Sequence, residues 1–440
     1  MINEKLAIFG GPRCVPEDVP EQELFGWPYI NKEIEDAVLD VIRRNAMSST
    51  EITVEFEKEF AAWQQRKYGI AYCNGTLSLQ AAMFGIGLGA GDEIIIPTKT
   101  YWASAISAMT LGASIVFANV DPNNLCLDPN DLERCLSPRT KAIMVVHYGG
   151  HPAEMDKICD FAKKHNIKVI EDVSHAQGGK FKGKMLGTFG DVAAMSLMSW
   201  KSFSCGELGI LVTDDRTIYE RSLAYSHYER NKPEFITETE ELKPFYHLPL
   251  GGMKGRVNQV ATAIGRVRLK DYDEKIAEIR KAMNYFCDLM EGVKGFRNIR
   301  VDEKDGSDMA GWYSPNILYI PEELGGLSEE KFLEALKAET GYSGYSGANN
   351  CLHTHNMLQD YDGLHTGKPS RILFADRDVR ELDKALEPSE KIRTLSIPWF
   401  KVYKPEYIEM YANGYKKVVA HYRELLDENQ DSDVGGIWHH

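Results

Sequence analysis

The sequence lacks the features that mark membrane-spanning and secreted proteins. No apolar run approaches the roughly 18 residues that a helix needs to cross a bilayer, and the opening MINEKLAIFGGP is too short and too mixed for a signal peptide. The eight cysteines are scattered singly without a CxxC pair, which is typical of reduced thiols and argues against a disulfide framework or a zinc site. We therefore expect a cytoplasmic protein that contacts no membrane.

Positive charge is also scarce. The 51 Lys and Arg residues are outnumbered by 65 Asp and Glu residues, for a formal net charge of −14. An acidic chain gains little from the phosphates of nucleic acid or from anionic lipid, so neither is an expected partner. Any anionic ligand must be held by a local pocket.

The 440 residues, 43% of them hydrophobic, suffice for about two or three domains with a large core.

Short β-branched runs alternate with helix-length segments over the first half of the chain. The runs are mostly continuous, as in strands buried on both faces. We predict seven such strands, over residues 69–73, 93–96, 114–120, 141–148, 168–172, 192–197 and 209–213. Strands joined by helical crossovers indicate an α/β fold with a mostly parallel, helix-covered sheet.

The second half of the chain is organised differently. A helical pattern from about Arg256 to Met290 loses its apolar stripe near Lys270, so we expect one helix that passes from a large domain into a smaller one. Two further helices are predicted over 327–340 and 404–426, and the acidic tail over 427–436 is expected to fray. The predicted domains are therefore an N-terminal arm (1–30), a large domain (31–275) and a small C-terminal domain (276–440).

The first candidate for binding chemistry is the turn Asn74-Gly75-Thr76, between a predicted strand and an apolar helix. A helix N-terminus offers free N–H groups and the positive end of the helix dipole, which suit a phosphate. Gly75 allows the backbone to approach closely, and the Thr76 hydroxyl adds one hydrogen bond. The simpler alternative is a capped helix start without a ligand.

The second candidate is Asp172, at the end of the strand predicted over 168–172. Ligands of open parallel sheets bind beyond the carboxyl ends of the strands, where a carboxylate can pair with a cation of the ligand. His175 follows closely and can donate to an oxygen of the same ligand. The alternatives are that Asp172 caps the following turn and that His175 lies on the surface.

The third candidate is Lys201, which follows the strand predicted over 192–197. Its neighbours are apolar and aromatic, namely Met198, Trp200 and Phe203. Desolvation in such surroundings lowers the pKa of an ammonium group and exposes a neutral amine for Schiff-base chemistry. Ser196 and Ser199 are candidate phosphate ligands close to it in the sequence. The alternative is a lysine whose charged end reaches the surface.

None of these features is specific alone, but together they define one kind of ligand. A phosphate cup, an acid at a strand end and an amine on a later loop fit a phosphorylated aromatic aldehyde with a basic ring nitrogen. Pyridoxal 5′-phosphate meets that description, because it needs a lysine for its aldehyde and a carboxylate that keeps its ring nitrogen protonated.

At these residues the chain resembles the sugar-aminotransferase family of fold-type I pyridoxal-phosphate enzymes, often called the DegT/DnrJ/StrS family. The similarity runs in order from about Glu35 to Lys270. It includes NGTLSLQAA, PTKTYWAS, VIEDVSHAQGG, GTFGDVAAMSLMSWKSFSCGELGILVTDD and LGGMKGRVNQVATAIGRVRLK. In the C-terminal third only LHTHNMLQDYDGLHTGKPS resembles the family. The resemblance implies a fold-type I transferase with a large domain built on a seven-stranded sheet and a smaller C-terminal α/β domain.

By this resemblance the catalytic residues are Lys201, Asp172 and His175. Lys201 matches the lysine that forms the internal aldimine and then carries a proton as general base. Asp172 matches the partner of the pyridinium nitrogen, and His175 matches the residue near the ring hydroxyl. Dehydratases of the family carry histidine in place of the lysine, so the presence of Lys201 favours transamination.

The same resemblance assigns the remaining cofactor contacts. Gly75, Thr76 and Ser196 match the phosphate cup. Tyr101 matches the aromatic residue that stacks on the cofactor ring, with Trp102 as the alternative if the register slips by one.

Three departures from the family pattern stand out. The usual GYN turn, whose asparagine reaches the phosphate of the partner subunit, reads Gly252-Met253-Lys254 here. A lysine can serve an anion as a point charge, so we assign Lys254 to the phosphate in trans. MSWK replaces the usual HPTK before Lys201 and makes its surroundings less polar. His151 replaces a common glutamine, and both a substrate contact and a neutral replacement stay open.

The resemblance implies an aminotransferase that works as a homodimer with shared active sites. The donor would be L-glutamate or L-glutamine and the acceptor a keto-sugar or keto-cyclitol, in a ping-pong cycle. Two alternatives stay open. One is a pyridoxal-phosphate dehydratase or lyase acting on a related sugar, and the other is a non-catalytic regulator that binds the cofactor. No DNA-binding helix signature or basic face supports the regulator.

His353 and His355 have the spacing of a metal-binding pair on a strand. Zinc needs a third or fourth ligand of suitable type, and Cys351 is the one such residue close in sequence. We therefore favour a sugar contact or a plain loop at this position, and we expect no metal.

Overall fold

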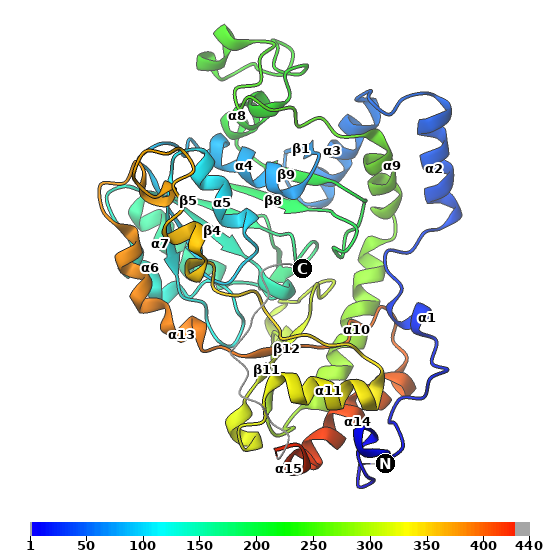
Figure 1. Ribbon diagram of the computed structural model, residues 1–440. Coiled ribbons are helices and arrows are strands. Elements are labelled where there is room, and N and C mark those ends of the chain that lie inside the picture. The colour runs from blue at the N-terminus through cyan, green and yellow to red at the C-terminus, as the bar shows by residue number, and fades with distance from the viewer. Residues whose placement is uncertain (1, 427–440) are drawn as a thin grey trace.

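The computed structural model describes residues 2–426, so the predicted fraying of the tail over 427–436 lies outside the described residues (Figure 1). A seven-stranded sheet in the order β1-β9-β8-β5-β4-β2-β3 forms the centre of the larger part. Its strands are β1 (Tyr68–Tyr72), β2 (Glu93–Pro97), β3 (Ser114–Ala118), β4 (Thr140–Val146), β5 (Lys168–Asp172), β8 (Val192–Ser196) and β9 (Gly209–Thr213). All neighbours pair in parallel except β9, which is antiparallel to β1 and β8. The predicted sheet is confirmed.

Helices pack against this sheet, which is why its strands are apolar throughout. Every residue of β2, β3 and β9 is buried, as expected for strands covered on both faces. The helices that contact its strands are α3 (Glu51–Trp63), α4 (Gly75–Gly85), α5 (Ala103–Thr110), α6 (Leu132–Cys135), α7 (Met155–His165) and α8 (Arg216–Ser226). A short hairpin of β6 (Lys180–Phe181) and β7 (Lys184–Met185) follows β5.

The single long helix predicted over 256–290 is instead two helices, α9 (Gln259–Arg268) and α10 (Tyr272–Met290). The break coincides with the loss of the apolar stripe near Lys270. It occurs because the two helices bury different faces: α9 packs against α2 (Lys32–Arg43) and α3, whereas α10 packs against α14 (Pro405–Ala420). One straight helix with a single stripe cannot serve both surfaces.

The smaller part is built on an antiparallel sheet of β10 (Phe296–Asn298), β11 (Asn316–Tyr319) and β12 (Thr394–Ser396). It carries α10, α11 (Glu329–Thr340), α14 and α15 (Tyr422–Leu425), so the helices predicted over 327–340 and 404–426 are present, the second interrupted at His421. The N-terminal residues, including α1 (Glu21–Phe25), pack in the hydrophobic core of this smaller part through Leu6, Val15 and Leu24. The domain boundaries at residues 30 and 275 stay a prediction.

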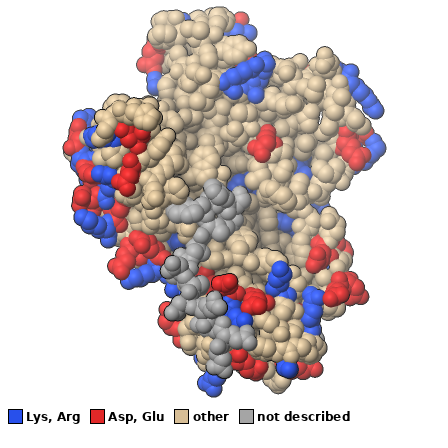
Figure 2. Space-filling model, viewed as in Figure 1, with Lys and Arg blue, Asp and Glu red and all other residues tan. Residues whose placement is uncertain are grey.

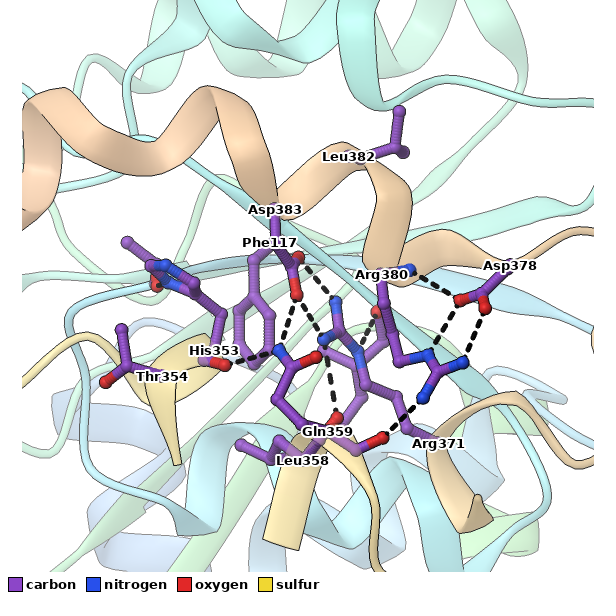
Figure 3. Close-up of polar contacts among 12 residues, drawn as sticks. Phe117, His353, Thr354, Leu358, Gln359, Arg371, Asp378, Arg380, Leu382 and Asp383 are labelled. Carbon is purple, nitrogen blue, oxygen red and sulfur yellow. Dashed lines mark hydrogen bonds and ion pairs between the residues drawn. The ribbon is translucent and has the colours of Figure 1, made fainter. Parts of the chain in front are cut away.

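The segment that contains α12 (Asn356–Gln359) and α13 (Glu387–Glu390) returns from the smaller part to cover the edge strand β3 (Figures 1 and 3). Arg371 is fully enclosed there. Its guanidinium binds both carboxylate oxygens of Asp383, at 2.6 and 2.8 Å, and donates to the carbonyl oxygen of Ile115 in β3 at 2.9 Å. An edge strand that is covered in this way cannot pair with a strand of another chain. The segment therefore protects the β3 edge of the large sheet.

The surface carries charges of both signs, as expected for a chain with 51 Lys and Arg residues and 65 Asp and Glu residues. On the face shown in Figure 2, Lys and Arg side chains are interspersed with Asp and Glu side chains. Over the part of the chain that the structure describes, no helix combines the length and apolarity needed to cross a membrane.

Candidate active site

A pocket of about 270 Å³ lies beyond the carboxyl ends of β1, β5 and β8. It is lined by seven of the eight residues selected from the sequence: Gly75, Thr76, Tyr101, Asp172, His175, Ser196 and Lys201. Asp172 and Ser196 are the last residues of β5 and β8, which are neighbours in the sheet. Since parallel strands carry their carboxyl ends to one edge, distant segments converge at this point.

The turn between β1 and α4 has the form of an anion cup. Asn74 is extended and caps α4, and its side chain accepts a hydrogen bond from the backbone N–H of Leu77 at 2.9 Å. The N–H groups of the first helical turn and the Thr76 hydroxyl border the pocket. Ser196 lies opposite them. A phosphate group would find backbone donors, two hydroxyls and the positive end of the helix dipole there.

Gly75 is required by packing as well as by the cup. A methyl group on its Cα would lie 2.5 Å from Cβ of Ser196 and 2.7 Å from its Cα, closer than real side chains approach. The cup therefore exists because Gly75 lets the start of α4 rest directly on the end of β8. From the sequence we expected Gly75 to let the backbone approach a ligand, whereas in the structure the close approach is to the neighbouring strand.

Asp172 is buried, with 5% of its surface exposed. Its Oδ2 accepts from the Ser104 hydroxyl at 2.8 Å and its Oδ1 from the backbone N–H of Ser174 at 3.0 Å. These bonds fix the carboxylate at the floor of the pocket but bring no positive charge to it. A buried carboxylate held in this way suits the protonated ring nitrogen of a cofactor, as the resemblance implied.

Lys201 is 8% exposed and has no hydrogen-bonding partner for Nζ among the described residues. Burial lowers the pKa of this amine to about 7, although the charge of Asp172 partly offsets the shift. Nζ lies 3.8 Å from the centre of the Tyr313 ring. A lysine with this pKa is substantially uncharged near neutral pH, which is the state that attacks an aldehyde.

His175 is held between aromatic rings at the side of the pocket. Its ring centre lies 4.6 Å from that of Tyr313 and 5.4 Å from that of Tyr148. Nδ1 accepts from the backbone N–H of Gly149 at 3.3 Å, so in the neutral ring the proton resides on Nε2. The role suggested for His175 near the ring hydroxyl stays a prediction.

Tyr101, and not Trp102, borders the pocket, so the structure favours the first of the two alternative registers. Trp102 packs beside it, with 5.0 Å between ring centres. The predicted stacking of Tyr101 on a cofactor ring stays a prediction.

Lys254 does not join the pocket of its own chain. It is exposed on the loop between α8 and α9, and its Nζ lies 5.9 Å from the centre of the Tyr228 ring. An exposed loop position is compatible with the assignment in trans, which needs a second subunit and stays a prediction.

Two pocket residues come from the smaller part of the chain and were not selected from the sequence. Tyr313 precedes β11, and Asn349 lies between α11 and β12. Neither belongs to a periodic segment or a recognisable motif, so nothing local marks them. Only the packing of the two parts brings them to Lys201.

His353 does not reach the pocket. Its Nδ1 is hydrogen-bonded to the Thr98 hydroxyl at 2.6 Å and its Nε2 to a carboxylate oxygen of Glu390 at 2.9 Å. The ring of His353 thus joins Thr98, at the end of β2, to Glu390 in α13. Both ring nitrogens are used in these bonds, so His353 makes no sugar contact through its ring. Within residues 2–426, no group of three or more His, Cys, Asp and Glu side chains could hold a metal ion.

Comparisons with known proteins agree with this geometry. The model of the DegT/DnrJ/EryC1/StrS aminotransferase family matches residues 28–369. The GDP-perosamine synthase of Caulobacter vibrioides is 36% identical over 262 residues, which are 59% of this chain and 67% of that protein. The L-glutamine:scyllo-inosose aminotransferase of Streptomyces griseus is 29% identical over 400 residues, which are 88% of this chain and 89% of that protein.

A solved structure has the same fold. The aminotransferase from Psychrobacter cryohalolentis superposes with a TM-score of 0.75 at 25% sequence identity. The superposition covers 91% of this chain and 100% of that chain. The likeness therefore includes the smaller C-terminal part, where the sequence resemblance is weak.

Proposed function

Because the chain belongs to the DegT/DnrJ/EryC1/StrS aminotransferase family, it is a transaminase, and we propose that it uses pyridoxal 5′-phosphate to move an amino group from L-glutamate or L-glutamine to a keto-sugar or keto-cyclitol. The observation that carries the proposal is Lys201, a buried amine with a pKa of about 7 in the same pocket as a buried carboxylate and an anion cup.

The residues of the pocket fit this cofactor. Gly75 lets the start of α4 lie against the end of β8, which brings Thr76 and Ser196 to the same pocket as donors for a phosphate. Asp172 would bind the ring nitrogen and keep it protonated, and His175 would donate to the ring hydroxyl. When bound, pyridoxal 5′-phosphate supplies an aldehyde that takes up the amino group and a ring that withdraws electrons from the reacting carbon.

Lys201 has two tasks in this proposal. Its uncharged Nζ would hold the cofactor covalently, and, when free of the cofactor, the same Nζ would move a proton to and from the substrate carbon as general base. A pKa near 7 suits both directions of transfer, because the amine is neither fully protonated nor a strong base at neutral pH. Burial also keeps water from the reacting atoms.

The covalent link is tested by comparing the wild type with Lys201→Ala. The wild type should show visible absorbance from bound cofactor, and borohydride should fix the cofactor to Lys201, as peptide mapping would show. Lys201→Ala should lose both signals. A label on another lysine would contradict the assignment.

The acceptor is tested by a half-reaction screen. The amine form of the enzyme is offered scyllo-inosose beside nucleotide-linked 3-keto and 4-keto sugars, and loss of the amine form is followed by absorbance. The relatives support both classes, since one is named for GDP-perosamine and one for scyllo-inosose. Release of a deoxygenated sugar in place of an amino product would favour a dehydratase, and absence of any half-reaction would favour a regulator.

We further propose a cytoplasmic homodimer with shared active sites. All eight cysteines are free thiols, which suits a reducing compartment.

Large apolar side chains are exposed near the Lys254 loop and the Lys201 loop, namely Trp200, Phe245, Leu248 and Met253. A second copy would cover them and place Lys254 near the partner's phosphate cup. Mixed dimers with Lys254→Ala test this, because unchanged cofactor affinity would contradict the contact in trans.

A further inference from the structure

Asn349 is the pocket residue whose role neither the sequence nor the cofactor explains. It lies between α11 and β12 and is 3% exposed, yet it lines the same pocket as Lys201 and Asp172. It therefore belongs to the smaller part of the chain but faces the chemistry built on the large sheet.

The orientation of Asn349 is fixed by hydrogen bonds. The Tyr148 hydroxyl accepts the backbone N–H of Asn349 at 2.9 Å and donates its one hydrogen to Oδ1 of the same residue at 2.7 Å. Lys99 Nζ donates to the Asn349 carbonyl oxygen at 3.3 Å. In this orientation Oδ1 accepts from the Tyr148 hydroxyl, so Nδ2 is the end of the amide that Tyr148 leaves without a partner.

The remaining group is the side-chain N–H₂ of Asn349. Among the described residues it has no hydrogen-bonding partner, although the side chain is nearly enclosed. Amide donors in such a place are ordinarily satisfied, because leaving them unpaired is costly. The pocket that Asn349 lines is where such a partner would sit.

The chemistry of this donor selects among the molecules that enter the pocket. The amino donor carries carboxylates, which call for cations, and the cofactor's phosphate, ring nitrogen and ring hydroxyl are assigned to other residues above. A neutral, rigid N–H₂ group suits the uncharged hydroxyl or ring oxygens of a polyhydroxylated ketone.

We propose that Asn349 is a specificity residue for the acceptor, and that its Nδ2 donates a hydrogen bond to an oxygen of the keto-sugar or keto-cyclitol. This inference rests on the proposed function. Tyr148 and Lys99 are positioning residues that hold Asn349 in place. Each is hydrogen-bonded to Asn349, and of the three residues only Asn349 lines the pocket.

The test separates the two half-reactions in the holoenzyme. Asn349→Ala removes the donor, and Asn349→Asp keeps the shape but replaces the donor with an acceptor. The amine form is reacted with scyllo-inosose and with a nucleotide-linked 4-keto sugar, and the faster acceptor is used. We expect kcat/KM of this acceptor half-reaction to fall about tenfold in Asn349→Ala, the effect of one hydrogen bond, and further in Asn349→Asp. The half-reaction with L-glutamine or L-glutamate should change less than about twofold.

Equilibrium binding provides a second readout. For a cyclitol acceptor, scyllo-inositol is the unreactive alcohol of scyllo-inosose; for a nucleotide-linked acceptor, the corresponding reduced sugar serves. Its dissociation constant, measured by calorimetry, should rise by a similar factor. Asn350→Ala is the matched control, because Asn350 lines a separate cleft of about 630 Å³ with Lys99 and Glu329. It should leave both half-reactions unchanged.

The outcomes are distinguishable. Equal losses in both half-reactions, or weaker cofactor binding in Asn349→Asp, would overturn the inference, because Asn349 would then act on the cofactor or the fold. Unchanged acceptor kinetics would overturn it as well. A wild type that aminates neither acceptor would contradict the proposed function itself, which is read from the wild type alone.

Discussion

The indole N–H of Trp27 donates a hydrogen bond to the backbone carbonyl oxygen of Lys201, at 2.9 Å. The other end of the lysine is also bounded by an aromatic residue, since Nζ lies 3.8 Å from the centre of the Tyr313 ring. Trp27 comes from the N-terminal arm and Tyr313 from the smaller C-terminal part. Lys201, the proposed catalytic lysine, is therefore oriented by segments outside the large sheet that carries its loop.

Replacing Trp27 by phenylalanine should impair the orientation of Lys201. The variant keeps an aromatic ring but leaves the Lys201 carbonyl without its donor, which costs about 1 kcal/mol. We expect both half-reactions to slow by about fivefold, since both use Lys201. Single-turnover absorbance measurements would show this. Trp63→Phe, which removes an indole bond to exposed Asp273, is the control and should have no effect.

The reaction of the cofactor-free enzyme with pyridoxal phosphate should depend on pH with a midpoint near 7. Burial lowers the pKa of Lys201 to about 7, so the reactive uncharged amine predominates above that pH and is lost below it. The initial rate of reconstitution should therefore rise from pH 6 to about pH 8 and then level off. A midpoint near the ordinary lysine value of about 10.4 would contradict the burial argument.

Gly75→Ala should push the start of α4 away from the end of β8 and so distort the phosphate cup. The added methyl group would lie 2.5 Å from Cβ of Ser196, and overpacking of this kind costs about 1–3 kcal/mol. We expect weaker cofactor binding and a lower free energy of unfolding, measured by spectroscopic titration and by denaturant. Gly89→Ala is the control, because a methyl group at Gly89 meets no atom within 4 Å. A cup that binds the cofactor normally in Gly75→Ala would disprove the steric role.

The buried pair of Arg371 and Asp383 should contribute strongly to stability. Arg371→Met would leave the Asp383 carboxylate enclosed without its counter-ion, which costs about 3–5 kcal/mol in the free energy of unfolding. Denaturant unfolding would measure it. The exposed pair of Arg139 and Asp376 offers a contrast, because water screens its charges, and Arg139→Ala should lower the free energy of unfolding far less than Arg371→Met. Similar losses in the two variants would show that the covering segment is not held by this pair.

The sequence by itself determined the large sheet and seven of the residues that line the candidate pocket. Continuous apolar runs predicted its seven strands, because strands covered on both faces need no polar residues. Asp172 and Ser196 were found because a strand end fixes where a residue lies along the sheet. The turn at Gly75 and the lysine at 201 were found because their neighbours in the chain create the local environment on which their roles depend.

The tertiary structure decided what depends on contacts between distant segments. The helix predicted as one is two, since α9 and α10 pack on different partners. Tyr313, Asn349 and the Arg371–Asp383 pair carry no local signal, because their surroundings are supplied by residues far away in the chain. A sequence pattern shows which side of an element is buried, but not which other element packs against that side. The walls of this pocket depend on that packing, so the sequence alone could not identify them.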